Sequence, residues 1–65
     1  MAGVGTNIRH LREAQNMTQS ELARQVGITQ AMLCYIERGS KNPSLQVGYE
    51  IAQALQCKVE DLLAE

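Results

Sequence analysis

The sequence predicts an all-α domain built from five short helices. Apolar residues recur at helical spacing, and no stretch alternates apolar and polar residues over a useful length. Tyr35 and Tyr49 are the only aromatic residues, so the core must be aliphatic, which favours packed helices over an aromatic-rich sandwich. At 65 residues, the chain is long enough for one domain only, and we assign residues 1–65 to it.

The first helix is expected from about Thr6 to Gln15. Val4, Ile8 and Leu11 follow the spacing of one helix face, and charged residues lie on its flanks. Thr6 can cap its N-terminus, because a threonine hydroxyl accepts a hydrogen bond from a free backbone N–H group.

A capping box predicts the start of the second helix. The Thr18 hydroxyl can accept a hydrogen bond from the backbone N–H of Glu21, while the Glu21 carboxylate accepts one from the backbone N–H of Thr18. Gly27 ends the helix, since a residue without Cβ adopts the left-handed conformation at little cost. Three apolar residues give the helix one buried face: Leu22, Ala23 and Val26.

The third helix is predicted over residues 29–38. Thr29 is a good N-cap, and Gly39 marks the other end. Leu33 and Ile36 face inward, and Ile28 is expected to fill the short turn that precedes the helix.

Residues 40–43 form a predicted loop, and two helices follow it. Ser44 caps the fourth helix, whose apolar residues are Leu45, Ile51, Ala52 and Leu55. The fifth helix is expected from Val59 to about Ala64, although Lys58 is a poor residue for its cap position.

The second and third helices have the spacing of a helix-turn-helix motif. The turn that starts at Gly27 is too short for the two helices to stack antiparallel. The third helix should then project from the body of the domain, and an α-helix fits the major groove of B-DNA, which is about 12 Å wide. No internal repeat supports the alternative, an array of helical hairpins.

A helical wheel divides residues 29–38 into an inner side, an outer side and the borders between them. The border residues are Gln30, Met32 and Cys34, and the outer ones are Ala31, Tyr35 and Arg38. Glu37 lies near the inner edge, where a charge needs a partner. Gln30 is the sharpest candidate for base contact, because its amide can make a bidentate contact with adenine. The predicted base-contacting residues are Gln30, Ala31, Met32 and Tyr35. For each of them, an ordinary solvated surface position is the alternative.

Residues around the third helix are candidates for phosphate contacts, because free helix N–H groups and polar or basic side chains bind phosphate. They are Thr18, Gln19, Thr29, Arg38, Ser40, Lys41 and Asn42. Residues 1–41 hold five basic and three acidic side chains, a balance of +2, whereas residues 42–65 hold one and four, a balance of −3. An anionic partner is therefore expected to meet the first two-thirds of the chain.

Four segments resemble the phage-repressor and Cro-type helix-turn-helix family, also called XRE-like: Thr18–Ala23, Val26–Gln30, Ile36–Gly39 and Pro43–Leu45. The resemblance extends over nearly the whole chain. It implies a five-helix lambda-repressor-like helix-turn-helix domain that binds operator DNA as a dimer, with the third helix in the major groove.

The same resemblance implies roles for single residues. Gln19 would hold a phosphate and orient Gln30, and Arg12 would form an ion pair with Glu37 beneath the DNA-contacting helix. The residues placed at the DNA surface are Thr29, Gln30, Ala31 and Tyr35. The chain departs from the family pattern at four positions, where it has Gly48 for a large apolar residue, Gln56 for a glycine, Cys57 for a valine-like residue and Ala31 for a polar residue, so the base preference of the family is not transferred.

The leading hypothesis is a cytoplasmic, sequence-specific regulator of transcription that binds a palindromic double-stranded DNA operator as a homodimer. The predicted dimer interface comprises Val47, Ile51, Ala54, Leu62 and Leu63, with burial inside the monomer as the alternative for Ile51 and Leu62. The second hypothesis is a protein-interaction module, such as an antitoxin or accessory subunit, that uses the same outer helix.

An enzyme is the weakest hypothesis, because His10 is the only histidine and has no paired nucleophile signal. No cofactor, metal ion or small-molecule ligand is implied. The chain has no apolar run of the roughly 18 residues that a membrane span requires, and its first residues lack the apolar stretch of a signal peptide. Cys34 and Cys57 are expected to be reduced packing residues, with redox sensing by Cys34 as the lesser alternative.

Overall fold

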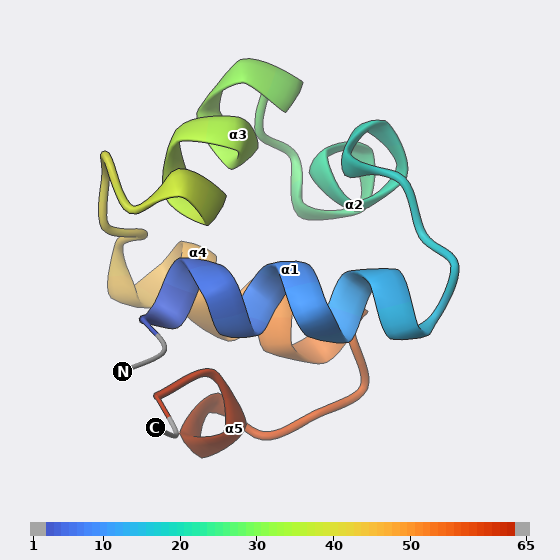
Figure 1. Cartoon of the computed structure of the whole chain (residues 1–65), viewed down its shortest axis with the longest axis vertical. Helices are drawn as coiled ribbons and strands as arrows, with labels where there is room; N and C mark the ends of the chain where they lie inside the picture. Colours follow the sequence, from blue (N-terminus) through green and yellow to red (C-terminus); the bar gives the residue numbers. More distant parts are fainter. Residues whose placement is uncertain (1–2, 64–65) are drawn as a thin grey trace.

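The computed structural model describes residues 3–63, which form five α-helices and no strand (Figure 1). The helices are α1 (Val4–Ala14), α2 (Gln19–Val26), α3 (Gln30–Arg38), α4 (Leu45–Ala54) and α5 (Val59–Leu63). The all-α prediction is confirmed. Ala64, the predicted end of the fifth helix, lies outside the described residues.

Three predicted side-chain caps are present. The hydroxyls of Thr18, Thr29 and Ser44 each accept a hydrogen bond from the backbone N–H three residues later, at 3.0–3.1 Å. The capping box of α2 is complete, because the backbone N–H of Thr18 also donates to Oε1 of Glu21 at 2.9 Å. This hydrogen bond stabilises the carboxylate and therefore lowers the pKa of Glu21.

The predicted cap at Thr6 is wrong. Gly3 is the N-cap of α1, with an extended backbone and no side-chain cap. Its carbonyl oxygen accepts from the backbone N–H of Asn7 at 3.0 Å, so helical hydrogen bonding has already begun before Thr6. Val4 packs against the core as the first residue of the helix, which explains the earlier start.

The start of α5 shows how an unfavourable cap residue is tolerated. The backbone N–H of Lys58 donates to Oδ2 of Asp61 at 3.0 Å. A carboxylate three residues into the helix thus satisfies the backbone at the cap position, which is one half of a capping box.

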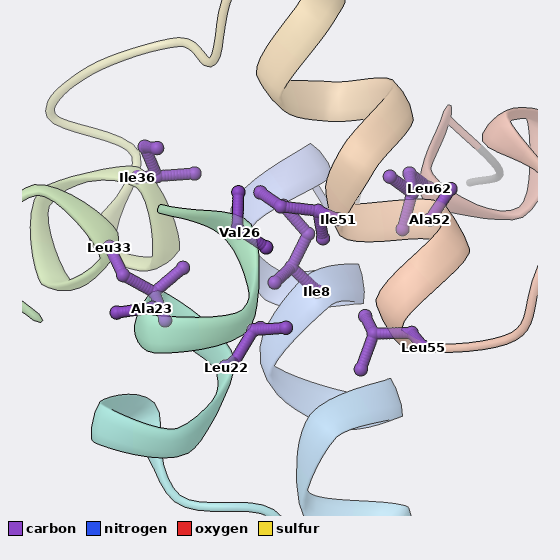
Figure 2. Packing of buried hydrophobic residues seen from close by; sticks show 10 residues of the cluster. All are labelled: Ile8, Leu22, Ala23, Val26, Leu33, Ile36, Ile51, Ala52, Leu55 and Leu62. Atoms are coloured by element: carbon purple, nitrogen blue, oxygen red, sulfur yellow. The ribbon is translucent and has the colours of Figure 1, made fainter. Parts of the chain in front are cut away.

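The core lies between α1 and the other four helices. α1 contacts α3 on one side and α5 on the other, while α4 contacts α2 and α5 (Figure 1). All five helices contribute to the cluster of buried apolar side chains in Figure 2, which comprises Ile8, Leu22, Ala23, Val26, Leu33, Ile36, Ile51, Ala52, Leu55 and Leu62. Leu45 does not join it, although the sequence placed it on the apolar face of the fourth helix: it is 86% exposed, at the first position of α4.

Side-chain amides connect α1 to the C-terminal helices. Nδ2 of Asn7 donates to the carbonyl oxygen of Leu62 at 2.9 Å, and Nε2 of Gln15 donates to that of Leu55 at 2.6 Å. Both acceptors belong to helix ends or helix-flanking residues that lack an intrahelical partner. These hydrogen bonds therefore satisfy the backbone of α4 and α5 while fixing α1 against them.

Glycine at position 5 permits the close approach of α1 to the C-terminal end of α3. A Cβ atom there would overlap the carbonyl oxygen of Ile36 and would lie 2.8 Å from the carbonyl oxygen of Glu37. Both are backbone atoms and cannot rotate away. The sequence alone gives no sign of this requirement at Gly5, because it arises only when the two helices meet.

Three of the four departures from the family pattern lie in or after α4, in different structural settings. A Cβ atom on Gly48 would meet nothing within 4 Å, so this position opens onto free space. Gln56 adopts the left-handed conformation (φ 57°) after the end of α4, which costs a non-glycine residue about 1–2 kcal/mol. Cys57 packs against the core, and its burial raises the pKa of the thiol.

Replacing Gly5 with alanine is expected to destabilise the domain by about 1–3 kcal/mol, because the added methyl group forces α1 away from α3. Thermal unfolding followed by circular dichroism measures the change, with about 4–8 °C of Tm for each kcal/mol in a domain of this size. Gly48→Ala is the matched control, since it adds the same methyl group in open space within a helix. It should raise the free energy of unfolding by about 0.5–1 kcal/mol. Equal shifts for both variants would contradict this account.

Candidate nucleic-acid interface

A three-residue turn, 27–29, sets α3 across α2 (Figure 1). Gly27 is left-handed (φ 82°), and the backbone N–H groups of Gly27 and Ile28 both donate to the carbonyl oxygen of Ala23, at 2.8 and 3.0 Å. Ile28 is half-buried and packs against the core, as the sequence predicted. The turn therefore fixes the angle between the two helices through both its backbone and its side chain.

α3 has the two sides that the helical wheel predicted. Leu33 and Ile36 are buried, at 0% and 2% exposure, and anchor its inner side. Its outer side carries the exposed residues Gln30, Ala31, Tyr35 and Arg38. Nothing in the described part of the chain covers this side, so it is free to meet a partner.

Met32 lies differently from the other three predicted base-contacting residues. It is half-buried and packs against the core on the flank of α3 that faces the loop before α4. There it lines a hollow with Ile28, Pro43 and Val47. Met32 is therefore a border residue of the outer side, and much of its side chain serves packing.

A buried ion pair holds α3 from below. Nε of Arg12 lies 2.7 Å from Oε2 of Glu37, and Nη2 of Arg12 donates to Oε1 of Glu37 at 3.1 Å. Nη1 of Arg12 donates to the carbonyl oxygen of Met17 at 2.7 Å. The two side chains are mostly buried, and the hydrogen-bonded carboxylate raises the pKa of Arg12. The pair that the resemblance implied is thus present.

Gln19 does not orient Gln30 in this structure, contrary to what the resemblance implied. Nε2 of Gln19 donates instead to Oε1 of Glu37 at 3.0 Å. The side chain that contacts Gln30 is Ser20, whose hydroxyl donates to Oε1 of Gln30 at 2.8 Å. The sequence contained no local signal for this contact, because the two residues lie ten positions apart on different helices.

The predicted phosphate-contacting residues lie at the starts of α2 and α3 and at the end of α3. Thr18 and Thr29 are exposed at the helix starts, where their hydroxyl oxygens serve as caps. Gln19 is half-buried because of its bond to Glu37. The other four lie at the end of α3 and in the loop after it, and all are exposed: Arg38, Ser40, Lys41 and Asn42.

The predicted dimer-interface residues divide into two groups. Ile51 and Leu62 are 0% and 2% exposed, so the alternative of burial within the monomer is the correct one for both. Neither residue offers side-chain surface to a partner. Val47 and Ala54 are half-buried, whereas Leu63 is 62% exposed. Two further apolar residues of α4, Leu45 and Tyr49, are exposed, although nothing in the sequence indicated it.

Residues 3–63 offer few candidates for metal binding, catalysis or redox chemistry. They contain no group of three or more His, Cys, Asp or Glu side chains that could hold a metal ion. His10 is exposed on α1. Cys34 and Cys57 are free and half-buried. None of the helices formed by these residues is long and apolar enough to cross a membrane.

Comparison with known proteins agrees with a helix-turn-helix arrangement of α2 and α3. The sequence model of a helix-turn-helix family matches residues 8–62. An uncharacterised HTH-type transcriptional regulator of Archaeoglobus fulgidus is 42% identical over 57 residues, which make up 88% of this chain and 80% of that one.

Two solved structures of DNA complexes are similar over nearly their whole length. The P22 c2 repressor protein in complex with a synthetic operator superposes with a TM-score of 0.92 at 27% identity, covering 97% of this chain and 96% of that one. SinR of Bacillus subtilis, a master regulator for biofilm formation, superposes in its DNA complex with a TM-score of 0.87 at 32% identity. That match covers 94% of this chain and 98% of the SinR chain.

Replacing Arg12 with alanine is expected to destabilise the fold by about 3 kcal/mol, because it leaves the buried carboxylate of Glu37 without its charged partner. Thermal unfolding should show a fall in Tm of more than about 10 °C. Arg9→Ala, at an exposed position of the same helix, is the matched control and should change stability by no more than about 0.5 kcal/mol. An unchanged Tm for Arg12→Ala would show that the pair contributes nothing.

Proposed function

The chain belongs to the helix-turn-helix family of DNA-binding transcriptional regulators, and on that premise we propose that it binds a specific palindromic operator as a homodimer. In this proposal α3 enters the major groove of double-stranded DNA. The protein acts in the cytoplasm, without catalysis, by occupying its operator.

One observation carries the proposal: α3 is anchored on one side and open on the other. Leu33, Ile36 and Glu37 are buried, whereas Gln30, Ala31 and Tyr35 are exposed. An exposed glutamine at the first position of the helix can contact an adenine edge, and a methyl group beside it can contact thymine. The phenol of Tyr35 offers a further polar contact one turn later.

Groups on both flanks of α3 support phosphate binding. The first backbone N–H groups of α2 have no intrahelical acceptor and carry the positive end of the helix dipole. Arg38 and Lys41 are exposed at the other end of α3, with Ser40 and Asn42 beside them. Arg12 is paired with Glu37 and mostly buried, so it is not offered to a phosphate, whereas Arg38 and Lys41 are exposed beside α3.

A dimer would supply the contacts that one small domain lacks. Two copies related by a two-fold axis can occupy half-sites about 34 Å apart, one turn of DNA. The apolar side chains that remain accessible for such an interface are Leu45, Val47, Tyr49, Ala54 and Leu63. A hollow beside Gly48, lined by Leu45, Val59 and Leu63, could accept side chains of the second copy.

Selection of bound fragments from a random DNA pool tests operator binding directly. We expect a palindromic consensus, and affinity for it should fall steeply with salt because phosphate contacts release counterions. Gln30→Ala should lose about 1–3 kcal/mol at one base position per half-site and leave non-specific binding unchanged. Uniform weakening on all sequences would contradict the role of Gln30. Binding of a polypeptide with little salt dependence, and none of DNA, would favour the protein-interaction hypothesis.

Analytical ultracentrifugation tests the homodimer. The unmodified chain should sediment as a dimer at high micromolar concentration. Leu63→Glu should shift it to the monomer, and at dilute, monomeric concentration it should change the Tm little, because Leu63 is exposed within one copy. A monomer mass that does not change with protein concentration would overturn the dimer proposal.

A further inference from the structure

Ser20 links the start of α2 to the start of α3. Its hydroxyl donates to Oε1 of Gln30 at 2.8 Å, and both residues are otherwise exposed. Ser20 has no other evident task, since Thr18 caps α2. From this geometry we propose that Ser20 is a positioning residue that fixes the carboxamide of Gln30 in the orientation suited to adenine. The inference rests on the proposed DNA-binding function.

While bonded to Ser20, the Gln30 amide still offers one acceptor and one donor, which match the groups on the major-groove edge of adenine. Oε1 has two lone pairs, and Ser20 occupies one of them. The other lone pair can accept from N6 of adenine, while the free Nε2 group can donate to N7. Guanine presents acceptors at both N7 and O6, so an amide held in this orientation would place its oxygen against O6.

Gln19 does not supply this restraint in the structure, although it precedes Ser20 in α2. Its amide donates to the carboxylate of Glu37, which in turn is held by Arg12. Gln19 is half-buried as a result. Among the hydrogen bonds of the described residues, the contact from Ser20 is the one that restrains the Gln30 side chain.

Positioning should change base preference more than overall affinity. A free glutamine side chain loses conformational entropy when it binds adenine bidentately, and a side chain already held by Ser20 loses less. A mismatched base makes no bidentate contact, so it gains nothing from the restraint. Removing the hydroxyl should therefore reduce the preference for adenine at the Gln30-dependent position by about two- to tenfold.

The experiment compares Ser20→Ala with the unmodified chain on the selected operator and on its three single-base variants at that position. Ser20→Ala should lower the affinity ratio for adenine by the stated factor, while Tm and the affinity for non-specific DNA stay unchanged. Ser20→Thr keeps the hydroxyl and should restore the ratio. Gln25→Ala, at an exposed position of the same helix, is the matched control and should leave the ratio unaltered.

A double variant separates positioning from other roles of Ser20. If Ser20 acts through Gln30, adding Ser20→Ala to Gln30→Ala should cause no further change in base preference. In the free protein, nuclear magnetic resonance should show the Gln30 side-chain amide becoming more mobile in Ser20→Ala but not in Ser20→Thr.

The results of these experiments test the role of Ser20 separately from the proposed DNA binding. If the unmodified chain selects an operator and Ser20→Ala keeps the full adenine preference, the positioning role is wrong and DNA binding stands. Equal weakening on every sequence would identify Ser20 as a phosphate contact and overturn the role as well. If the unmodified chain selects no sequence, the proposed function fails and the inference fails with it.

Discussion

The carboxylate of Glu37 is the point at which three helices of this domain are joined. It accepts hydrogen bonds from Arg12 of α1 and from Gln19 of α2, while it belongs to α3 itself. A nearly buried carboxylate is tolerated only when its oxygens accept hydrogen bonds. Arg12 and Gln19 are therefore both needed to stabilise Glu37 in this position. Among the described residues, no buried side-chain nitrogen or oxygen lacks a partner.

This polar junction determines how α3 is rotated about its axis. Leu33 and Ile36 hold the helix against the core, but apolar contacts alone permit small rotations with little change in buried area. A bidentate ion pair has a fixed geometry, and it allows only one orientation of the helix surface. The close contact of Gly5 with the carbonyl groups of α3 adds a limit on distance. The direction of the outer residues therefore depends on interactions made on the opposite side.

Local signals allowed most of the architecture to be predicted. Capping residues such as Thr18, Thr29 and Ser44 act within one turn of their helices, so their effect is visible in the sequence alone. The two sides of α3 were predictable for a similar reason, since helical periodicity determines on which side of the helix each residue lies.

What the sequence did not reveal depends on how the helices meet. The hydrogen bond of Ser20 with Gln30, and the exposure of Leu45, follow from the angle between elements rather than from spacing. The role of Gln19 was transferred from a resemblance. Its implied contact with Gln30 is absent because the Gln19 amide reaches a buried carboxylate, and a charged acceptor makes the stronger hydrogen bond. At the start of α5, the side chain of Asp61 compensated for a residue that propensity disfavours.

Both ends of α3 are already ordered in the isolated chain. Thr29 closes the first turn, and the backbone N–H groups of Gly39 and Ser40 close the last one through Ile36 and Tyr35. A segment organised in this way docks as a rigid body, without the coupled folding that gives large heat-capacity changes in calorimetry. The thermodynamic cost of ordering would then fall mainly on the nucleic acid and its hydration.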